Sequence, residues 1–305
     1  MRTRRRTFLE GMLAVGAAAL APSLARTEEG APLIRHIPSS GEAIPAIGLG
    51  SWITFNVGDD IVLMDECADV IAAFFAAGGR MIDSSPMYGS SQPVIGYGLK
   101  KSGHPEPLFS AEKVWTSSGP GGPEQIEQSR QLWGVPRFDL VQVHNLLNWE
   151  QHLKTLIDMK AAGQVRYVGV TTSEGRRHDL LEEIMQTQAL DFVQFTYNIV
   201  DREPEQRLLP LAAERGIAVI VNRPFQQGLL TRRLQTERLP EWAAEIGAAT
   251  WAQLILKYII SHPAVTVAIP ATTSVDHVGE NLAAATGAMP DSAMRARISS
   301  YVQAL

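Results

Sequence analysis

The segment "LVQVHNLLNWEQHLKTLIDMKAAGQVRYVGVTT", residues 140–172, decides the fold class. It opens with a short apolar run, Leu140–His144, and closes with a second, Tyr167–Thr171. Between them, Glu150–Ala162 has apolar residues at spacings of three and four, which predicts a helix, and Gly163 follows as its C-terminal cap. Two apolar strands joined by one helix predict a parallel crossover.

The same unit recurs along the chain after residue 30. Strands are predicted at Ala46–Leu49, Met81–Ser84, Leu108–Trp115, Leu140–His144, Tyr167–Thr171, Phe192–Tyr197, Ala218–Asn222 and Thr266–Ile269. Helices are predicted at Asp65–Ala77, Pro93–Lys101, Glu124–Leu132, Glu150–Ala162, His178–Gln186, Glu205–Glu214, Thr250–Ser261 and Val275–Ala284. This alternation is typical of an α/β fold with a parallel sheet.

Two arrangements of such a sheet compete, an open doubly wound sheet and a closed barrel. The open sheet would carry a glycine-rich phosphate loop after its first strand, but "IGLGSW", residues 47–52, is too short for that motif and precedes no immediate helix. The near-even units therefore favour a (β/α)8 TIM barrel. Residues 26–305 are predicted to form a single barrel domain, with an N-terminal hairpin within 32–46 over its lower mouth and a C-terminal helix at 293–305.

The N-terminus has the order of an export signal. In "TRRRTFLEGMLAVGAAALAPSLA", residues 3–25, an arginine cluster precedes a mildly apolar stretch and an A-x-A-like cleavage site. Arg5-Arg6 resembles the twin-arginine motif, so residues 1–25 are predicted to be a cleavable signal read by the twin-arginine translocase, and the mature protein to be periplasmic. The apolar stretch is too short for a span of roughly 20 residues, so no membrane anchor is expected after cleavage. A basic disordered tail is the alternative.

Composition excludes several classes of protein. The net charge is −5, and no basic run follows the first six residues, which argues against a nucleic-acid partner. Cys67 is the single cysteine, and the seven histidines show no ligand spacing. An internal disulfide and a metal site are therefore not expected.

Four polar residues mark the ends of successive predicted strands: Asp83 with Tyr88 in the loop after it, Lys113 and His144. A buried lysine needs a carboxylate partner, which Asp83 on a neighbouring strand would supply. The ammonium would lower the pKa of Tyr88, and a neutral His144 would orient a carbonyl oxygen. Together these groups suit carbonyl reduction. For each residue alone, a structural role such as capping a turn is the alternative.

Longer segments around these residues resemble the aldo-keto reductase family over nearly the whole mature chain. They are "GGRMIDSSPMYGSSQPVIGYGL" (78–99), "WGVPRFDLVQVHN" (133–145), "GQVRYVGVTTS" (163–173) and "FVQFTYNIVDR" (192–202). The resemblance implies a (β/α)8 barrel that reduces an aldehyde or ketone with a nicotinamide cofactor. It places the catalytic tetrad on Asp83, Tyr88, Lys113 and His144, with Tyr88 as the proton donor.

The same resemblance implies a set of cofactor-binding residues. Gln194 matches the residue that holds the nicotinamide carboxamide, and Thr171-Thr172 replace the usual Ser-Asn pair. Asn222 stands where the family often has a stacking tyrosine, and Arg223 beside it offers a guanidinium to the pyrophosphate.

The adenosine end of the cofactor matches "IPATTSVDHVGENL", residues 269–282, with Thr272, Glu280 and Asn281 as the binding residues. Ala271 and His277 replace the basic residues that commonly clamp a 2′-phosphate. NADPH is the expected cofactor, with NADH as the alternative. A small carbonyl compound or sugar is the expected substrate.

Two other functions remain open from the sequence. One is a cofactor-binding sensor or interaction module with little turnover, and the other is a lyase or isomerase that uses Lys113 as a Schiff-base amine. Candidates for an apolar substrate pocket are Trp52, Phe55, Met87, Trp115, Leu146 and Trp149.

Overall fold

The structure, a computed structural model, describes residues 31–305. The predicted signal peptide lies outside the described residues. The strands are β1 Ile34–His36, β2 Ala43–Pro45, β3 Leu49–Gly50, β4 Met81–Asp83, β5 Phe109–Val114, β6 Phe138–Val143, β7 Val165–Thr171, β8 Phe192–Thr196, β9 Ala218–Asn222 and β10 Val267–Ala268. The α-helices are α1 Ile61–Ala76, α2 Ser91–Lys101, α3 Gly122–Trp133, α4 Trp149–Ala161, α5 His178–Thr187, α6 Leu208–Arg215, α7 Leu229–Leu234, α8 Trp251–Ile260, α9 Val275–Ala283 and α10 Ser292–Ala304. Short 3-10 helices are η1 His144–Leu146, η2 Glu203–Glu205 and η3 Glu241–Ile246.

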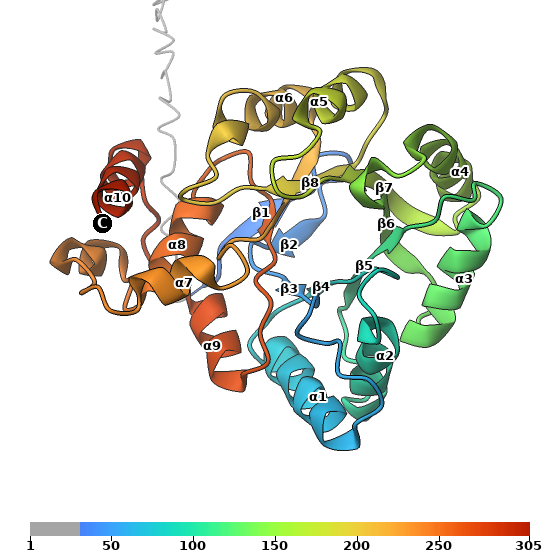
Figure 1. Cartoon of the computed structure of the whole chain (residues 1–305), viewed down its shortest axis with the longest axis horizontal. Coiled ribbons are helices and arrows are strands. Elements are labelled where there is room, and N and C mark those ends of the chain that lie inside the picture. Colours follow the sequence, from blue (N-terminus) through green and yellow to red (C-terminus); the bar gives the residue numbers. More distant parts are fainter. Residues whose placement is uncertain (1–30) are drawn as a thin grey trace, which may run out of the picture.

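Strands β3 to β10 form one sheet in which each strand pairs in parallel with its neighbours in chain order. Parallel bridges from Ile47 to Ala268 and from Gly50 to Ala271 join the first strand to the last. The sheet therefore closes on itself, with the helices around it (Figure 1). The predicted (β/α)8 barrel is confirmed.

Alternation along the strands separates the inner and outer faces of the barrel. On β5, Phe109 and Ala111 belong to the inner apolar cluster, and Lys113 shares their side of the strand. Phe192 of β8 belongs to the same cluster, and Gln194 follows it on the same side. The inner face is thus apolar at the amino ends of the strands and polar at the carboxyl ends.

A hairpin made by β1 and β2 contributes to the closed end of the barrel. The two strands pair antiparallel, with Ile34 opposite Pro45. Ile37 and Ile44 are fully buried in the inner cluster, together with barrel residues such as Tyr167. The amino end of the barrel is therefore filled by apolar side chains, which leaves the carboxyl end for a binding site.

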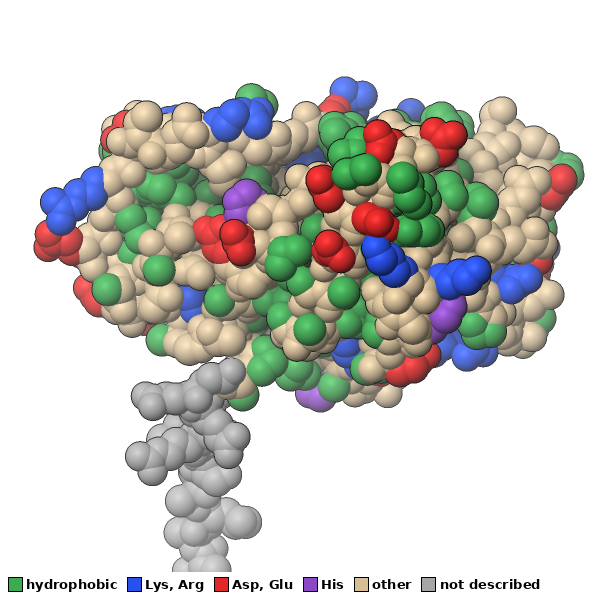
Figure 2. All heavy atoms as spheres, turned by 90° about the horizontal axis from the view of Figure 1, so that it is seen from below, with side chains coloured by type: hydrophobic (Ala, Val, Ile, Leu, Met, Phe, Trp, Pro, Cys, Tyr) green, Lys and Arg blue, Asp and Glu red, His purple; other side chains and the backbone are tan. Residues whose placement is uncertain are grey.

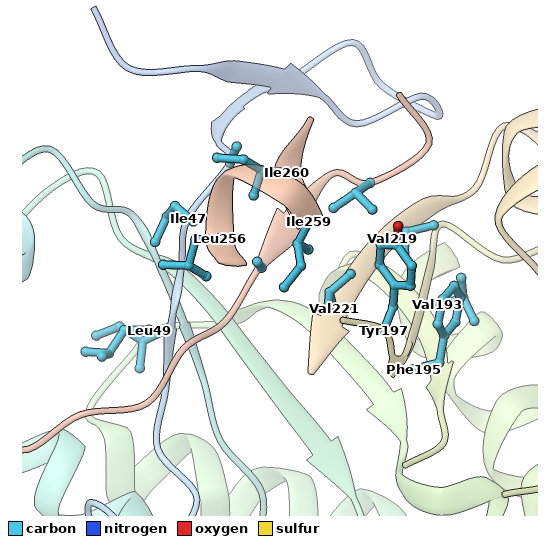
Figure 3. Packing of buried hydrophobic residues seen from close by; sticks show 14 of the residues in the cluster. Ile47, Leu49, Val193, Phe195, Tyr197, Val219, Val221, Leu256, Ile259 and Ile260 are labelled. Carbon is cyan, nitrogen blue, oxygen red and sulfur yellow. The ribbon is translucent and has the colours of Figure 1, made fainter. Parts of the chain in front are cut away.

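The helices pack on the outer face of the barrel through a larger apolar cluster. Figure 3 shows Ile259 of α8 near Val221 of β9, and Leu256 and Ile260 of the same helix near Ile47. Val219 and Val221 alternate along β9 with Ala218 and Ile220 of the inner cluster. The strand therefore contributes side chains to both apolar clusters.

Some boundaries differ from those expected. Helix α1 begins at Ile61, earlier than predicted, because the Asp60 side chain accepts hydrogen bonds from the backbone N–H groups of Val62 and Leu63. Strand β3 covers only Leu49–Gly50, and the residues before it join the barrel through backbone hydrogen bonds to the β10 region. Helices α7 and η3 lie between β9 and α8, where no element is expected from the sequence.

Charges are mixed on the surface. On the face shown in Figure 2, Lys and Arg side chains are interspersed with Asp and Glu among hydrophobic side chains. Within residues 31–305, no helix has both the length and the apolar character needed to cross a membrane.

Candidate active site

A single cavity of about 890 Å³ brings the predicted site residues together. Its lining includes every one of them: Asp83, Tyr88, Lys113, His144, Thr171, Thr172, Gln194, Asn222, Arg223, Thr272, Glu280 and Asn281. They come from strand ends and loops that are far apart in the chain.

Asp83 and Lys113 form a buried ion pair inside the barrel. The Lys113 Nζ donates to Asp83 Oδ1 at 2.6 Å and to the Ser84 carbonyl oxygen at 2.7 Å. Their strands, β4 and β5, are adjacent in register, so both side chains reach the same point on the inner face. Burial raises the pKa of Asp83, and the charge and hydrogen bond of Lys113 oppose that shift. The pairing expected from the sequence is confirmed.

Tyr88 lies in the loop after β4, over the ion pair. The Lys113 Nζ is 5.3 Å from the centre of the Tyr88 ring, which is a cation–π arrangement rather than a hydrogen bond to the phenol. Burial and the negative charges of Asp83 and Glu112 hold the pKa of Tyr88 well above 10. The expected lowering of this pKa is therefore wrong for this structure, because burial of the phenol and the two nearby carboxylates outweigh the effect of the Lys113 ammonium.

His144 follows β6 and meets Tyr88 edge to face, with ring centres 5.6 Å apart and an interplanar angle of 84°. The Nδ1 atom of His144 lies 2.7 Å from Ser85 Oγ. Burial and the positive charge of Lys113 hold the pKa of His144 well below 6.5. The imidazole is therefore neutral at neutral pH, as the expected chemistry requires.

The inner face beyond the tetrad offers amide and hydroxyl groups. Thr172 and Gln194 are both buried, and the Thr172 Oγ1 has no hydrogen-bond partner among the described residues. Thr171 Oγ1 accepts from the backbone N–H of Asn145 at 3.1 Å. A buried hydroxyl without a partner at a cavity wall fits a polar ligand group such as a carboxamide. These residues therefore suit the nicotinamide end of the expected cofactor.

Gln142 supports Gln194 and was not expected from the sequence. It is fully buried on β6, and its Nε2 donates to Gln194 Oε1 at 3.2 Å. This bond occupies the oxygen of Gln194 and leaves its amide NH2 to donate elsewhere. The inward parity of Gln142, between Leu140 and His144, is a sequence signal that could have found it.

Asn222 and Arg223, at the end of β9, are both tied to protein groups. Asn222 donates to the Thr172 carbonyl oxygen at 2.9 Å and accepts from Thr196 Oγ1 at 2.7 Å. The Arg223 Nη1 donates to Glu174 Oε1 at 2.5 Å, so its charge is partly neutralised in this structure. Asn222 thus links the carboxyl ends of β7, β8 and β9. Glu174, the partner of Arg223, was not predicted from the sequence.

The expected adenosine end lies along α9 and the loop before it. Thr272 and Asn281 are buried, and Glu280 accepts a hydrogen bond from Thr250 at the start of α8. His277 also lines the cavity, and its Nδ1 lies 3.3 Å from Thr272 Oγ1. This end of the cavity is therefore formed by the start of α8, the loop before α9 and α9 itself.

Glu112, the neighbour of Lys113, points to the opposite side of β5. It is fully buried, and it accepts hydrogen bonds from Gln92 Nε2 at 2.9 Å and from Trp133 Nε1 at 2.8 Å. Burial raises its pKa to about 7. Glu112 thus links β5 to α2 and α3, outside the cavity.

The six candidates for an apolar substrate pocket lie in different surroundings. Trp52 and Met87 line the cavity. Phe55 and Leu146 are instead buried in the outer core, and neither Trp115 nor Trp149 is among the lining residues. Loop aromatics follow no strand parity, so their direction could not be derived from sequence. Among residues 31–305, no group of three or more histidine, cysteine, aspartate or glutamate side chains is placed to hold a metal ion.

The sequence and fold of this chain are similar to those of known proteins. The family model described as "Aldo/keto reductase family" matches residues 46–300. The NADH-specific methylglyoxal reductase of Escherichia coli is 27% identical over 230 residues, which cover 64% of this chain and 68% of that protein. The L-galactose dehydrogenase of Arabidopsis thaliana is 24% identical over 83% of this chain and 88% of its own.

Solved structures show the same fold. An aldo/keto reductase from Klebsiella pneumoniae, in complex with NADP and acetate, superposes with a TM-score of 0.73 at 24% identity, covering 86% of this chain and 93% of that one. The family model covers most of the chain, including every residue of the tetrad. This chain therefore belongs to the aldo/keto reductase family.

Proposed function

We propose that this protein reduces an aldehyde or ketone with a nicotinamide cofactor, and that Tyr88 donates the proton. The observation that carries the proposal is the Asp83–Lys113 ion pair beneath the Tyr88 ring, with His144 at its edge, in one cavity. Family membership and the nicotinamide-dependent relatives support it.

Each residue has a distinct role in the proposed reaction. A nicotinamide held beside Thr172 and Gln194 would supply the hydride that reduces the carbonyl carbon. Tyr88 keeps its proton in the resting protein because its pKa is high, and it gives that proton to the carbonyl oxygen, which yields an alcohol. His144 orients the carbonyl oxygen, while the Lys113 ammonium, fixed by Asp83, stabilises the phenolate that remains.

The fixed lysine favours this reaction over Schiff-base chemistry. A Schiff base needs an unprotonated, accessible amine, whereas Lys113 is buried and its Nζ donates to a carboxylate and a carbonyl oxygen. Borohydride trapping of a carbonyl compound on Lys113 would contradict this assignment.

The decisive test compares the wild-type protein with Tyr88→Phe on a panel of small aldehydes, ketones and sugars. We expect kcat to fall by about 100-fold or more, since the variant lacks the donated proton. NADPH affinity, followed by fluorescence, should stay within about twofold. Equal turnover by both proteins would exclude Tyr88 as the donor. Cofactor binding without turnover by the wild type would favour the sensor alternative.

NADPH is the proposed cofactor, with NADH as the alternative. Ala271 and His277 stand where a basic clamp for a 2′-phosphate is common, and the Escherichia coli relative is named NADH-specific, whereas the Klebsiella pneumoniae structure holds NADP. Parallel titrations with both cofactors decide the preference. The function fails at its first step if neither binds more tightly than about 1 mM.

Export is a separate part of the proposal. Residues 1–25 direct the protein through the twin-arginine translocase to the periplasm, where cleavage leaves Arg26 as the first residue. The test is cell fractionation with N-terminal sequencing of the mature protein. Replacing Arg5 and Arg6 by lysine should keep the protein in the cytoplasm, and unchanged export of that variant would contradict the route.

A further inference from the structure

Ser85 is a buried serine beside the tetrad with no role in the chemistry above. It lies two residues after Asp83 and has no exposed surface. Its Oγ has two partners among residues 31–305: His144 Nδ1 at 2.7 Å and the backbone N–H of Met87 at 3.1 Å. These two contacts constrain where the imidazole of His144 carries its proton.

A serine hydroxyl has one hydrogen to donate and two lone pairs to accept with. The Met87 N–H occupies one lone pair of Ser85. If His144 were protonated on Nδ1, it would fill the second lone pair and leave the buried hydroxyl hydrogen without an acceptor in the described chain. If His144 is protonated on Nε2, the hydroxyl donates to Nδ1 and all three groups are satisfied.

A doubly protonated ring would meet the same obstacle, since its Nδ1–H would also point at Ser85. Burial and the Lys113 charge disfavour that cation independently, because they lower the pKa of His144. The neutral Nε2–H form is the one that the contacts and the electrostatics both allow.

We propose that Ser85 is a positioning residue that holds His144 in its Nε2–H tautomer. The Nε2 atom has no protein hydrogen-bond partner in the described part of the chain, and His144 lines the cavity beside Tyr88. The ring thus presents a donor to the cavity, so that a carbonyl oxygen receives one hydrogen bond from His144 and one from Tyr88. The catalytic consequence rests on the proposed reductase function, whereas the tautomer does not.

Histidine NMR tests the tautomer directly. In protein labelled with ¹⁵N in its histidines, with the His144 signals assigned by a His144→Asn variant, the wild type should show a protonated Nε2 and an unprotonated Nδ1. Ser85→Ala should convert this pattern to a mixture or to the Nδ1–H form, and Ser85→Thr, which keeps the hydroxyl, should retain it. A wild-type Nδ1–H form, or an unchanged pattern in Ser85→Ala, would overturn the proposal.

Kinetics test the consequence. Ser85→Ala should lower kcat at least about tenfold with little change in KM for the cofactor, and Ser85→Thr should recover most of the loss. Ser91→Ala is the matched control, because it removes another buried serine hydroxyl, bonded to Ser84 Oγ at 2.8 Å, without contact to His144. Loss of activity in Ser91→Ala equal to that in Ser85→Ala would reduce Ser85 to a structural role. Absence of wild-type turnover would refute the reductase function, while the NMR result would still decide the tautomer.

Discussion

Glu112 and Lys113 are neighbours on β5, yet they belong to opposite sides of the barrel wall. The ammonium of Lys113 faces the cavity and is paired with Asp83, whereas the carboxylate of Glu112 faces α2 and α3. Three N–H groups, from Gln92, Trp133 and the Lys113 backbone, donate to Glu112. These bonds and the Lys113 charge only partly offset burial, which raises the Glu112 pKa to about 7.

This carboxyl should make stability depend on pH. The folded protein binds the Glu112 proton more tightly than the unfolded chain, because the pKa of Glu112 is raised in the folded state. The resulting contribution to the free energy of unfolding is complete below the unfolded pKa of 4.5 and is lost as pH rises through about 7. The loss amounts to about 3 kcal/mol. In urea unfolding from pH 4.5 to 8, the free energy of unfolding of the wild type should fall with rising pH. Glu112→Gln should remove this dependence. The variant should also be less stable overall, because the new amide N–H groups face other hydrogen-bond donors.

The exposed Glu241→Gln serves as the control for that slope. Glu241 lies in η3 with its side chain 88% exposed, so its replacement should change the free energy of unfolding little. An identical slope in the wild type and in Glu112→Gln would show that Glu112 titrates equally in both states and would contradict the prediction.

At the scale of elements, the close packing of two helices depends on a glycine at their contact. Gly96 of α2 packs so closely on α3 that an added Cβ would lie 1.9 Å from the Leu132 carbonyl oxygen. Gly279 of α9 has no atom within 4 Å of the same position. Both glycines are in helix interiors, so composition alone does not distinguish them.

The pair gives opposite predictions for the same substitution. Gly96→Ala should destabilise the protein by about 1–3 kcal/mol, because α2 and α3 must separate. Gly279→Ala should stabilise it by up to about 1 kcal/mol, because alanine favours the helix and limits the unfolded chain. Urea unfolding of both variants measures this. A higher free energy of unfolding in Gly96→Ala than in the wild type would contradict the close contact between α2 and α3.

At the scale of the whole molecule, one end of the barrel contributes packing and the other end holds the candidate active site. The hairpin residue Ile44 is fully buried among apolar side chains at the amino end, and the cavity with the tetrad lies at the carboxyl end. Stability and chemistry should therefore be separable by mutation.

Ile44→Ala tests this separation. The cavity it leaves should lower the free energy of unfolding by about 2–4 kcal/mol. Below the unfolding temperature, kcat on a carbonyl substrate should stay within about twofold of the wild type. Ile34→Ala on the same hairpin, where the side chain is 43% exposed, should change stability by under about 0.5 kcal/mol. A large fall in kcat in Ile44→Ala at low temperature would show that the two ends are coupled.

The strand–helix alternation, and with it the barrel and the polar strand ends, could be predicted from the sequence. Strand period, helix period and the parity of inward residues are local properties, so the pairing of Asp83 with Lys113 follows from their positions on adjacent predicted strands. Loop and boundary details were less accessible. The start of α1 depends on one capping carboxylate, Asp60, and the irregular stretch that holds α7 and η3 has no clear period.

The pKa values and hydrogen-bond partners of the site residues follow from the three-dimensional arrangement and could not be predicted from the sequence. Closure joins Ile47 to Ala268, and the serine that contacts His144 lies 59 residues from it in the chain. The pKa of Tyr88 rises because burial and the charges of Asp83 and Glu112 act on it while the ammonium is held by Asp83. Electrostatic shifts and hydrogen-bond partners depend on distance and burial in three dimensions, which no spacing along the chain specifies.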